Sequence, residues 1–464
     1  MENKIILIGL GPHSKRIYIR FIINNNYKLA YIVELKEKEE ELRKFLFDNN
    51  LNDVKLYLVD SKDKDNEILK DCYQKDLKEI IECEKITHAI ISTEPKAHYS
   101  YLKFFIEQEV NVLVDKPVIV TNGLVNNQAS RDELVYKMKE ICHLYKSKKN
   151  KINVSVMCQR RYSDVYLFIK NYIKQIIYEY NIGITNMHIS TSDGMWNMPD
   201  EFYTRENHPY RYGYGKLMHS GYHFVDLILY LLNENINLKG KEVGKLSLKS
   251  SAYFPKDFFK VVNNSDYQKL FGVDYQKYLE LDNQMFGEID VHSLLDFKDN
   301  ENHLLTSVSF DMLQSGFTRR AWSDLPVDTY KGNGRIKHNF VEINLGPLVS
   351  IKIISFQAKL KKEGFDGVGL GDNDHFEIQI YRNTELIGGE LIKVYNVADF
   401  TQQNDDFIGY NEVYRENLFF DFMNNRKGKS DLLTHYQSMV LTKYIYDSID
   451  KNIDVDFKLE GSEE

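Results

Sequence analysis

The chain has 464 residues and carries 60 Lys and Arg against 68 Asp and Glu, which gives a formal net charge of −8. Hydrophobic residues make up 43% and charged residues 28%, a balance typical of globular proteins with more than one packed core. An acidic chain lacks the positive charge that binding to nucleic acid phosphates requires, and no window approaches the roughly 18 uninterrupted apolar residues of a membrane-spanning helix.

Cysteine usage and the first residues bear on the compartment. The four cysteines are Cys72, Cys83, Cys142 and Cys158. Their spacing matches neither a disulfide framework nor a metal site. The apolar stretch at residues 5–10 is too short for a secretory signal. We therefore expect a protein of the reducing cytoplasm.

The first 150 or so residues alternate short apolar runs with amphipathic stretches. The apolar runs predict strands at 4–9, 29–33, 54–59, 87–92, 111–114 and 152–157. Apolar positions at helical spacing predict helices at 14–24, 36–47, 98–108 and 131–146. Unbroken apolar strands that alternate with helices are typical of a parallel sheet buried on both faces. This pattern predicts a doubly wound parallel sheet in the N-terminal part of the chain.

The pattern changes beyond residue 158, where we place the domain boundary. Helices are predicted at 164–178, 218–232, 412–424 and 432–447, and strands at 338–345, 348–356, 376–381 and 392–395. From about residue 243 apolar residues alternate at period two, and Gly346-Pro347 marks a turn between two strands. We expect a mixed or antiparallel sheet with helices on one face. Residues 253–285 fit no clear pattern and are interpreted as an insertion.

The segment Gly-Leu-Gly-Pro-His-Ser at 9–14 follows the first predicted strand and opens a helix. Two glycines allow a tight turn and a close approach to a pyrophosphate, which the helix N-terminus stabilises. Glu34, 23 residues beyond Gly11, ends the second strand, where a carboxylate accepts hydrogen bonds from ribose hydroxyls. An ordinary turn and a solvated helix start are the alternatives. We assign the cofactor site to Gly9, Gly11, Pro12, His13, Ser14 and Glu34.

Two further segments follow the fourth and fifth predicted strands. They contribute Ser92, Thr93, Pro95 and His98, and then Asp115 and Lys116. Ligands bind at the carboxyl edge of doubly wound sheets, so both loops are candidates for the site. A partly desolvated lysine there can hydrogen-bond a substrate oxygen and assist proton transfer, because burial lowers its pKa. A structural histidine and a surface lysine are the alternatives.

The order GxGxxS, TxPxxH and DKP at these separations resembles the Gfo/Idh/MocA family of NAD(P)-dependent sugar oxidoreductases. The resemblance implies that Thr93, Pro95 and His98 form the loop beside the nicotinamide. It also implies that Asp115-Lys116-Pro117 is the family's Glu-Lys-Pro signature, with Asp replacing Glu. Arg161 matches an arginine that the family places at the domain junction. The implied cofactor is NAD, and Lys36 and Lys38 after Glu34 leave NADP possible.

Residues 213–226, Gly-Tyr-Gly-Lys-Leu-Met-His-Ser-Gly-Tyr-His-Phe-Val-Asp, extend the resemblance into the second half. The family pattern G-G-G-x-L-x-D-x-G-x-H-x-x-D is matched at Gly213, Gly215, Leu217, Gly221, His223 and Asp226. His223 then corresponds to the catalytic histidine that handles the hydroxyl proton together with Lys116. His219 replaces the family's catalytic Asp, and a histidine cannot supply a fixed negative charge. We expect His219 to relay the proton or to orient His223.

Two other interpretations concern this half of the chain. His219, His223 and Asp226 can share one helix face, which suggests a metal site, but the HExxH pattern is absent and we predict no metal. Trp196, Arg211 and Tyr212 lie in a polar, aromatic loop where the family binds substrate, and ordinary loop packing is the alternative. The substrate site is assigned to Lys116, Trp196, Arg211, Tyr212, His219 and His223.

Together these observations predict an α/β protein. Residues 1–158 are assigned to an N-terminal Rossmann domain with a doubly wound parallel sheet. Residues 159–464 are assigned to a substrate-binding and oligomerisation α/β domain with a large, mostly antiparallel, open-faced sheet. The resemblance implies hydride transfer between nicotinamide and a hydroxyl of a sugar, sugar derivative or cyclitol, in a homodimer or homotetramer. We expect neither nucleic acid nor membrane as a partner.

Two alternatives keep the fold and change the activity. Some relatives use a transient NAD oxidation to cleave glycosides, which departs from the usual two-carboxylate scheme. Others bind dinucleotide or sugar as non-catalytic regulators, and His219 at the Asp position favours that alternative.

Overall fold

The computed structural model describes residues 3–64, 66, 68–205, 208–281, 285–323, 334–358, 375–400, 409–426, 428–449 and 451–460. The chain forms two units, each with its own sheet. The first unit comprises Met1–Thr121, Asp132–Ser163 and Asp405–Val440, and the second comprises Asn122–Arg131, Asp164–Asn404 and Leu441–Glu464. The prediction divided the chain at residue 158 into two continuous domains. In the structure each unit consists of three segments from distant parts of the chain.

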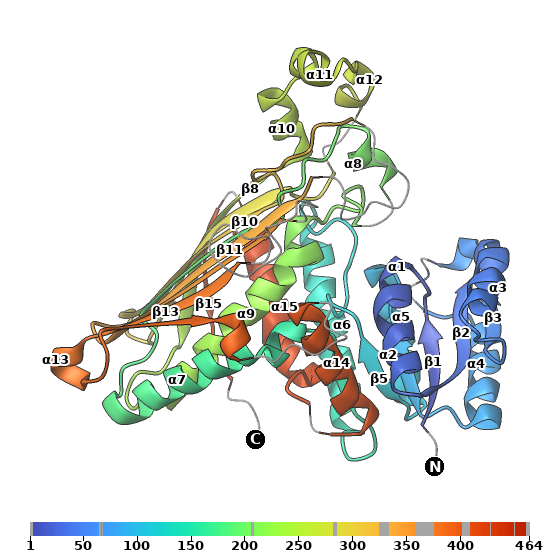
Figure 1. The fold of residues 1–464 in the computed structure, drawn as a ribbon, viewed down its shortest axis with the longest axis horizontal. Coiled ribbons are helices and arrows are strands. Elements are labelled where there is room, and N and C mark those ends of the chain that lie inside the picture. The colour runs from blue at the N-terminus through green and yellow to red at the C-terminus, as the bar shows by residue number, and fades with distance from the viewer. Residues whose placement is uncertain are drawn as a thin grey trace. The chain divides into compact units, whose positions relative to one another are not determined.

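Six parallel strands form the sheet of the first unit, in the order β3-β2-β1-β4-β5-β6. They are β1 (Lys4–Ile8), β2 (Lys28–Leu35), β3 (Lys55–Val59), β4 (His88–Ile91), β5 (Asn111–Val114) and β6 (Val154–Val156). Figure 1 shows helices on both faces of this sheet, and the side chains of β1 from Ile5 to Ile8 are at most 1% exposed. The predicted doubly wound parallel sheet is confirmed. Its strand order reverses between β1 and β4, the position at which such sheets bind ligands.

The helical segments of the first unit are α1 (Pro12–Ser14), η1 (Lys15–Ile19), α2 (Arg20–Asn24), η2 (Lys36–Lys38), α3 (Glu39–Asp48), η3 (Ser61–Asp63), α4 (Asp71–Glu84), α5 (Pro95–Glu107), η4 (Gln159–Tyr162), α14 (Tyr410–Met423) and η8 (Leu432–His435), with most of α6 (Gln128–Lys146). The predicted helix at 14–24 is a continuous helical stretch whose middle, η1, is π-helical. Helix α4 was not predicted. The late helix α14 belongs to this unit because its apolar face packs into the same core as β1 and η1.

Nine strands form the sheet of the second unit, in the order β14-β13-β12-β11-β7-β10-β9-β8-β15. They are β7 (Asn186–Ser192), β8 (Lys245–Tyr253), β9 (Asp290–Lys298), β10 (Leu304–Leu313), β11 (Ile336–Leu345), β12 (Val349–Ala358), β13 (Phe376–Arg382), β14 (Ile392–Asn396) and β15 (Asn452–Asp456). Every neighbouring pair is antiparallel except β7 with β10. The predicted mostly antiparallel sheet is confirmed, including the hairpin at Gly346-Pro347. Strands β7 and β15 were not predicted, and β8, β9 and β10 were covered only by the general alternation from about residue 243.

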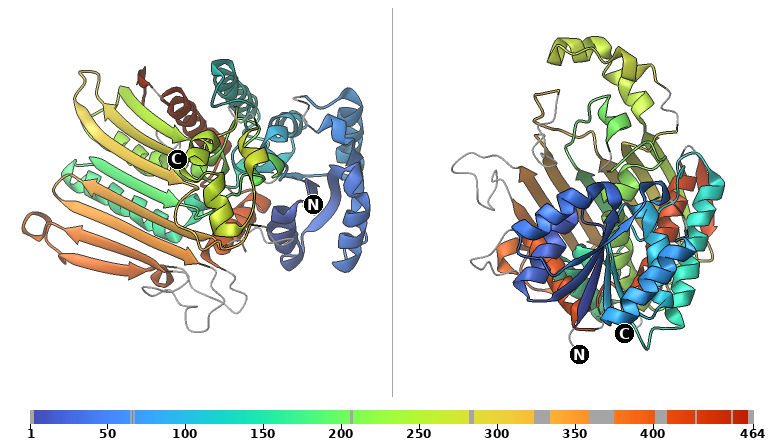
Figure 2. Two further views of the ribbon diagram at one scale, coloured as in Figure 1. Left: turned by 90° about the horizontal axis from the view of Figure 1, so that it is seen from above. Right: turned by 90° about the vertical axis from the view of Figure 1, so that its right-hand side faces the viewer.

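Two long helices cover one face of this sheet, α7 (Asp164–Tyr180) and α9 (Tyr222–Leu232), as Figures 1 and 2 show. The remaining helical segments of the unit are α8 (Glu201–Thr204), η5 (Leu217–Gly221), η6 (Asn233–Asn237), α10 (Pro255–Val261), α11 (Asn264–Phe271), α12 (Gln276–Leu279), α13 (Thr384–Ile387) and η7 (Val397–Asp399), and α15 (Tyr436–Asp447) ends in it. Every side chain of α9 is buried. No described helix is both long and apolar enough to span a bilayer.

The insertion interpreted at 253–285 consists mainly of the three short helices α10, α11 and α12, which lie together beyond one end of the sheet (Figure 1). Residues 282–284 of it lie outside the described residues. The aromatic side chains of the insertion form two clusters with the loop after β7. One cluster centres on Phe202 and Phe259, and the other on Met198 and Tyr267. The insertion is therefore a packed extension of that loop.

Candidate functional site

The glycine-rich loop follows β1 at the carboxyl edge of the first sheet. Gly9 has φ +89°, and a Cβ on it would lie 2.6 Å from the Ser92 carbonyl oxygen, so only glycine fits there. A Cβ on Gly11 would meet nothing within 4 Å. Pro12 then begins the helical stretch. The loop is closed on the sheet side and open above Gly11, as backbone that approaches a phosphate requires.

Glu34 lies in β2 and reaches this loop, as its spacing predicted. Its Oε2 accepts a hydrogen bond of 2.8 Å from the Leu10 amide, and its Oε1 accepts one of 2.9 Å from the Leu35 amide. Lys38 Nζ lies 3.4 Å from Oε1. The side chain is therefore fixed beside the glycine loop, with lone pairs left for further donors.

A chain of hydroxyl groups ties the loop to the ends of β4 and β5. Ser14 Oγ donates to Ser92 Oγ at 2.8 Å, and Ser92 Oγ donates to Asp115 Oδ2 at 2.6 Å. The Tyr18 hydroxyl donates to the other oxygen of Asp115. Ser14, at the third glycine position, thus contributes a hydrogen bond that glycine could not make. Sequence reasoning missed Tyr18, which appeared only as an apolar helix position.

His98 connects the two loops that follow β4 and β5. Its ring is fully buried, with Nδ1 3.0 Å from the Pro117 carbonyl oxygen and Nε2 3.2 Å from that of Thr93. Pro95 occupies the first turn of α5. Burial lowers the pKa of His98. The predicted residues of the two loops therefore lie close together. His98 connects the loop that carries Thr93 to the loop that carries Lys116.

Two other predicted cofactor residues have different surroundings. His13 Nε2 lies 3.9 Å from Asp115 Oδ1, yet desolvation of this half-exposed ring, with Arg415, Arg16 and Lys116 nearby, lowers the pKa of His13, so its imidazole is neutral at pH 7. Arg161 is buried, and its guanidinium donates to the Thr434 carbonyl oxygen at 3.1 Å and to the Lys429 carbonyl oxygen at 3.4 Å. The structure thus places Arg161 against the segment that leads into α15.

The predicted histidine segment opens η5 and α9 in the second unit. A Cβ on Gly213 would lie 2.6 Å from Gly123 Cα, and one on Gly215 would lie 2.0 Å from the Glu288 carbonyl oxygen. Close backbone packing therefore explains both glycines. His219 and His223 are each 8% exposed.

Aromatic rings surround His219. Its ring centroid lies 4.9 Å from that of His208, 5.3 Å from that of Tyr210 and 5.6 Å from that of Tyr214. Tyr214 stands where the family has a second glycine. Across the described ranges, no three His, Cys, Asp or Glu side chains are grouped so that they could hold a metal ion.

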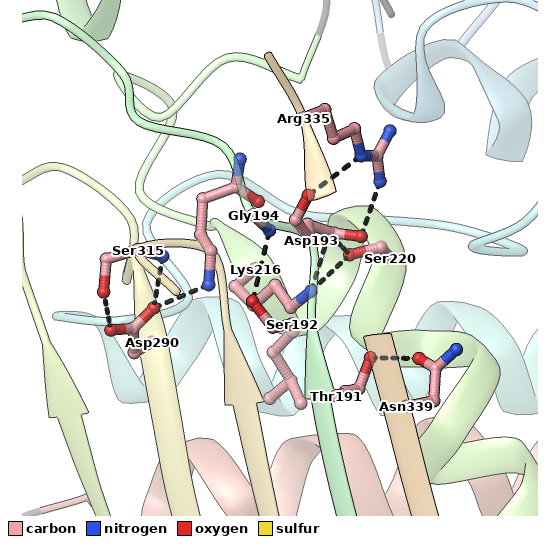
Figure 3. A network of polar contacts seen from close by, with 12 residues as sticks. Thr191, Ser192, Asp193, Gly194, Lys216, Ser220, Asp290, Ser315, Arg335 and Asn339 are labelled. Atoms are coloured by element: carbon pink, nitrogen blue, oxygen red, sulfur yellow. Dashed lines mark hydrogen bonds and ion pairs between the residues drawn. The ribbon is translucent and has the colours of Figure 1, made fainter. Parts of the chain in front are cut away.

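A buried ionic network beside η5 was not predicted (Figure 3). Lys216 is fully buried, and its Nζ lies 2.6 Å from Asp193 Oδ2 and 2.9 Å from Ser220 Oγ. Arg335 Nη2 lies 2.6 Å from Asp193 Oδ1. Burial opposes the ionisation of Asp193, but Lys216 and Arg335 hold its pKa well below the usual range. The available signal was a lysine inside the histidine segment at 213–226.

Glu288 is a second unpredicted group at the start of η5. It is fully buried, its carbonyl oxygen accepts from the Lys216 amide at 2.8 Å, and its Oε1 accepts from the Leu217 amide at 2.8 Å and from the Tyr446 hydroxyl at 3.0 Å. Among the described residues its Oε2 has no hydrogen-bond partner. Burial raises the pKa of Glu288 to about 7. It lies just beyond residues 253–285, and no predicted motif included it.

The loop residues predicted to bind substrate make packing contacts. The Trp196 ring lies 5.2 Å from that of Phe271, and its Nε1 donates to the Tyr267 hydroxyl at 3.4 Å. The Arg211 guanidinium lies 5.0 Å from the Tyr212 ring centroid and donates to the Tyr203 carbonyl oxygen at 3.0 Å. Trp196 therefore joins the loop to the insertion, and Arg211 holds the loop together.

Comparison with known protein families gives one match, in the N-terminal part of the chain. Residues 4–153 match the GFO_IDH_MocA family, described as an oxidoreductase family with an NAD-binding Rossmann fold. No curated protein sequence matches the chain.

Solved structures share the architecture over nearly the whole length. An oxidoreductase from Agrobacterium radiobacter in complex with NAD+, L-tartaric acid and magnesium aligns with a TM-score of 0.57 and 11% identity, covering 98% of each chain. An aldose-aldose oxidoreductase from Caulobacter crescentus aligns at 0.55 and 12%, covering 98% of this chain and 100% of that one. A UDP-N-acetylglucosamine 3-dehydrogenase from Acidithiobacillus ferrooxidans aligns at 0.53 and 9%, covering 97% and 98%. At these identities the likeness establishes the fold.

Proposed function

Because residues 4–153 match an oxidoreductase family with an NAD-binding Rossmann fold, we propose that the protein transfers hydride between a nicotinamide cofactor and a hydroxyl-bearing carbon of a sugar, sugar derivative or cyclitol. The observation that carries the proposal is the glycine-rich loop with the carboxylate of Glu34 hydrogen-bonded to it. The resemblance of residues 213–226 to the family's catalytic segment supports the substrate class.

The residues of the first unit fit a dinucleotide. Gly9 lets the loop lie flat on the end of β4, and the open space above Gly11 leaves room for a phosphate. Glu34 is held where ribose hydroxyls can donate to it. When bound, the cofactor supplies the hydride acceptor or donor of the reaction.

The catalytic roles are carried over from the family. In this proposal Lys116 polarises the substrate oxygen, His223 takes or returns the hydroxyl proton, and His219 relays that proton or orients His223. His219, ringed by aromatic side chains, supplies no carboxylate at that position. This observation favours a non-catalytic regulator that binds the same cofactor as the second candidate.

We also propose that the protein works in the cytoplasm as a homodimer or homotetramer. All four cysteines are free, as in a reducing compartment. The large sheet of the second unit exposes apolar side chains such as Leu294 and Leu304, at 55% each, which supports an interface between copies.

Titration with NADH and NADPH, followed by nicotinamide fluorescence, tests the proposal. We expect NADH to bind and Glu34→Ala to weaken its binding roughly 10- to 100-fold, the value of one or two charge-assisted hydrogen bonds. Glu40→Ala removes an exposed carboxylate from the neighbouring helix and should leave the affinity unchanged. A wild-type protein that binds neither nucleotide would refute the proposal.

Lys116→Ala separates catalysis from cofactor binding. In a screen of sugars and cyclitols that detects NADH by absorbance, this variant should lose roughly 10²- to 10⁴-fold in turnover and keep most of its NADH affinity. Unchanged turnover would remove Lys116 from the mechanism. Wild-type protein that binds NADH but turns over no polyol would favour the regulator.

A further inference from the structure

Helix α14 brings charged side chains to the glycine-rich loop from the far end of the chain. Phe419 packs its ring 5.5 Å from that of Phe21 and 6.3 Å from that of Tyr18. This packing fixes α14 along η1 and α2, the helical stretch that follows the loop. The charged residues of α14 therefore have defined positions near the loop.

Glu412 of α14 holds two arginines together. Its Oε1 lies 2.7 Å from Arg16 Nη1 and 3.1 Å from Arg415 Nη1. The Arg415 side chain is only 14% exposed. Burial lowers the pKa of Arg415, and Arg16 lowers it further. Among these three side chains, the two guanidinium groups carry two positive charges and the carboxylate carries one negative charge, so one positive charge is not neutralised within the group.

The surplus charge acts on the loop itself. Arg415, Arg16 and Lys116 all lower the pKa of His13, against the opposing effect of Asp115. Both oxygens of Asp115 accept hydrogen bonds from hydroxyl groups, those of Tyr18 and Ser92. Among the described side chains at this point, Arg16 and Arg415 carry two positive charges against the one negative charge of Glu412.

A surplus positive charge at this place would favour a bound dinucleotide. A helix N-terminus offers the equivalent of about half a positive charge, whereas a diphosphate carries about two negative charges. Glu34 adds a further negative charge at the same loop. The loop and the helix alone therefore leave the diphosphate largely uncompensated.

We propose that Arg415, with Arg16, forms part of the dinucleotide site and supplies the positive charge that offsets the cofactor diphosphate. This inference rests on the proposed function and adds a residue from the C-terminal part of the chain to the cofactor site. The competing explanation is that Arg415 only ties α14 to the neighbouring helices.

The two explanations predict opposite results for Glu412. If Arg415 acts through its charge, Arg415→Gln should raise the dissociation constant of NADH about tenfold, and Glu412→Gln should lower it several-fold by removing a negative charge. If Arg415 is only a tie, both substitutions break the same contact and neither strengthens binding. Arg415→Lys keeps the charge and should retain most of the affinity.

A matched control lies about one turn along the same helices, where Arg20 Nη2 lies 3.7 Å from Glu416 Oε2. Arg20→Gln should leave NADH binding unchanged, while thermal melts report what either bridge contributes to stability. Raising the salt concentration should weaken NADH binding less in Arg415→Gln than in the wild type.

The outcomes remain separate from those of the proposed function. A wild type that binds NADH while Arg415→Gln binds it equally well overturns this inference alone. If Arg415→Gln fails to fold, Glu412→Gln and Arg415→Lys decide: unchanged or weaker binding in Glu412→Gln overturns the inference.

Discussion

Replacing Glu288 by Gln should remove a pH-dependent loss of stability between pH 4.5 and pH 7. The carboxyl is fully buried, and burial raises its pKa from 4.5 to about 7. Below pH 4.5 it is protonated in both the folded and the unfolded state. As the pH rises, the unfolded chain releases the proton first, so the free energy of unfolding falls by roughly 3 kcal/mol before it levels off above pH 7.

The amide introduced by Glu288→Gln cannot ionise, and its carbonyl oxygen can still accept from the Leu217 amide and the Tyr446 hydroxyl. Urea unfolding at pH 5, 6, 7 and 8 should therefore show that the free energy of unfolding of the variant increases relative to that of the wild type as the pH rises. Glu280→Gln, at an exposed position of the insertion, is the control and should follow the wild-type profile. Parallel profiles for Glu288→Gln and the wild type would contradict the prediction.

The sequence predicts the first sheet well because each of its buried strands is a continuous apolar run. The carboxyl ends of parallel strands lie at one edge of the sheet. The spacing between Gly11 and Glu34 therefore correctly predicted that Glu34 reaches the glycine-rich loop. The failures are of two kinds. Helix α4 is amphipathic but charged on most of its surface, and only Leu77 of it is buried. Strands β7 and β15 take their place from pairing with distant partners, which no local pattern contains.

The same distinction applies to the candidate site. Motifs within one loop, such as the segment from Thr93 to His98, were found because the chemistry lies close together in sequence. Arg415 and Glu288 were missed because tertiary packing alone brings them to the glycine-rich loop and to η5, respectively. Trp196 and Arg211 are the opposite case. The aromatic and basic composition of their loop predicted substrate binding, whereas the described contacts of both side chains are packing contacts within the protein.

Asp193→Asn should destabilise the second unit strongly, by about 3–5 kcal/mol. The carboxylate compensates the fully buried ammonium of Lys216 at 2.6 Å and accepts from Ser220 at 2.5 Å and from Arg335 at 2.6 Å. An amide carries no charge, so Lys216 would remain buried as a cation without its counter-ion. Its other described contact is the neutral hydroxyl of Ser220.

Lys216→Met should cost clearly less, because Asp193 keeps Arg335 and Ser220 and no buried ammonium is left without a counter-ion. The double variant should cost less than the sum of the two single changes, since no buried ammonium then remains to be compensated. Urea unfolding of the four proteins at pH 7 gives the coupling energy, and NADH titration of each shows whether the first unit stays intact. Additive costs would mean that the coupling between Asp193 and Lys216 makes no net contribution to stability.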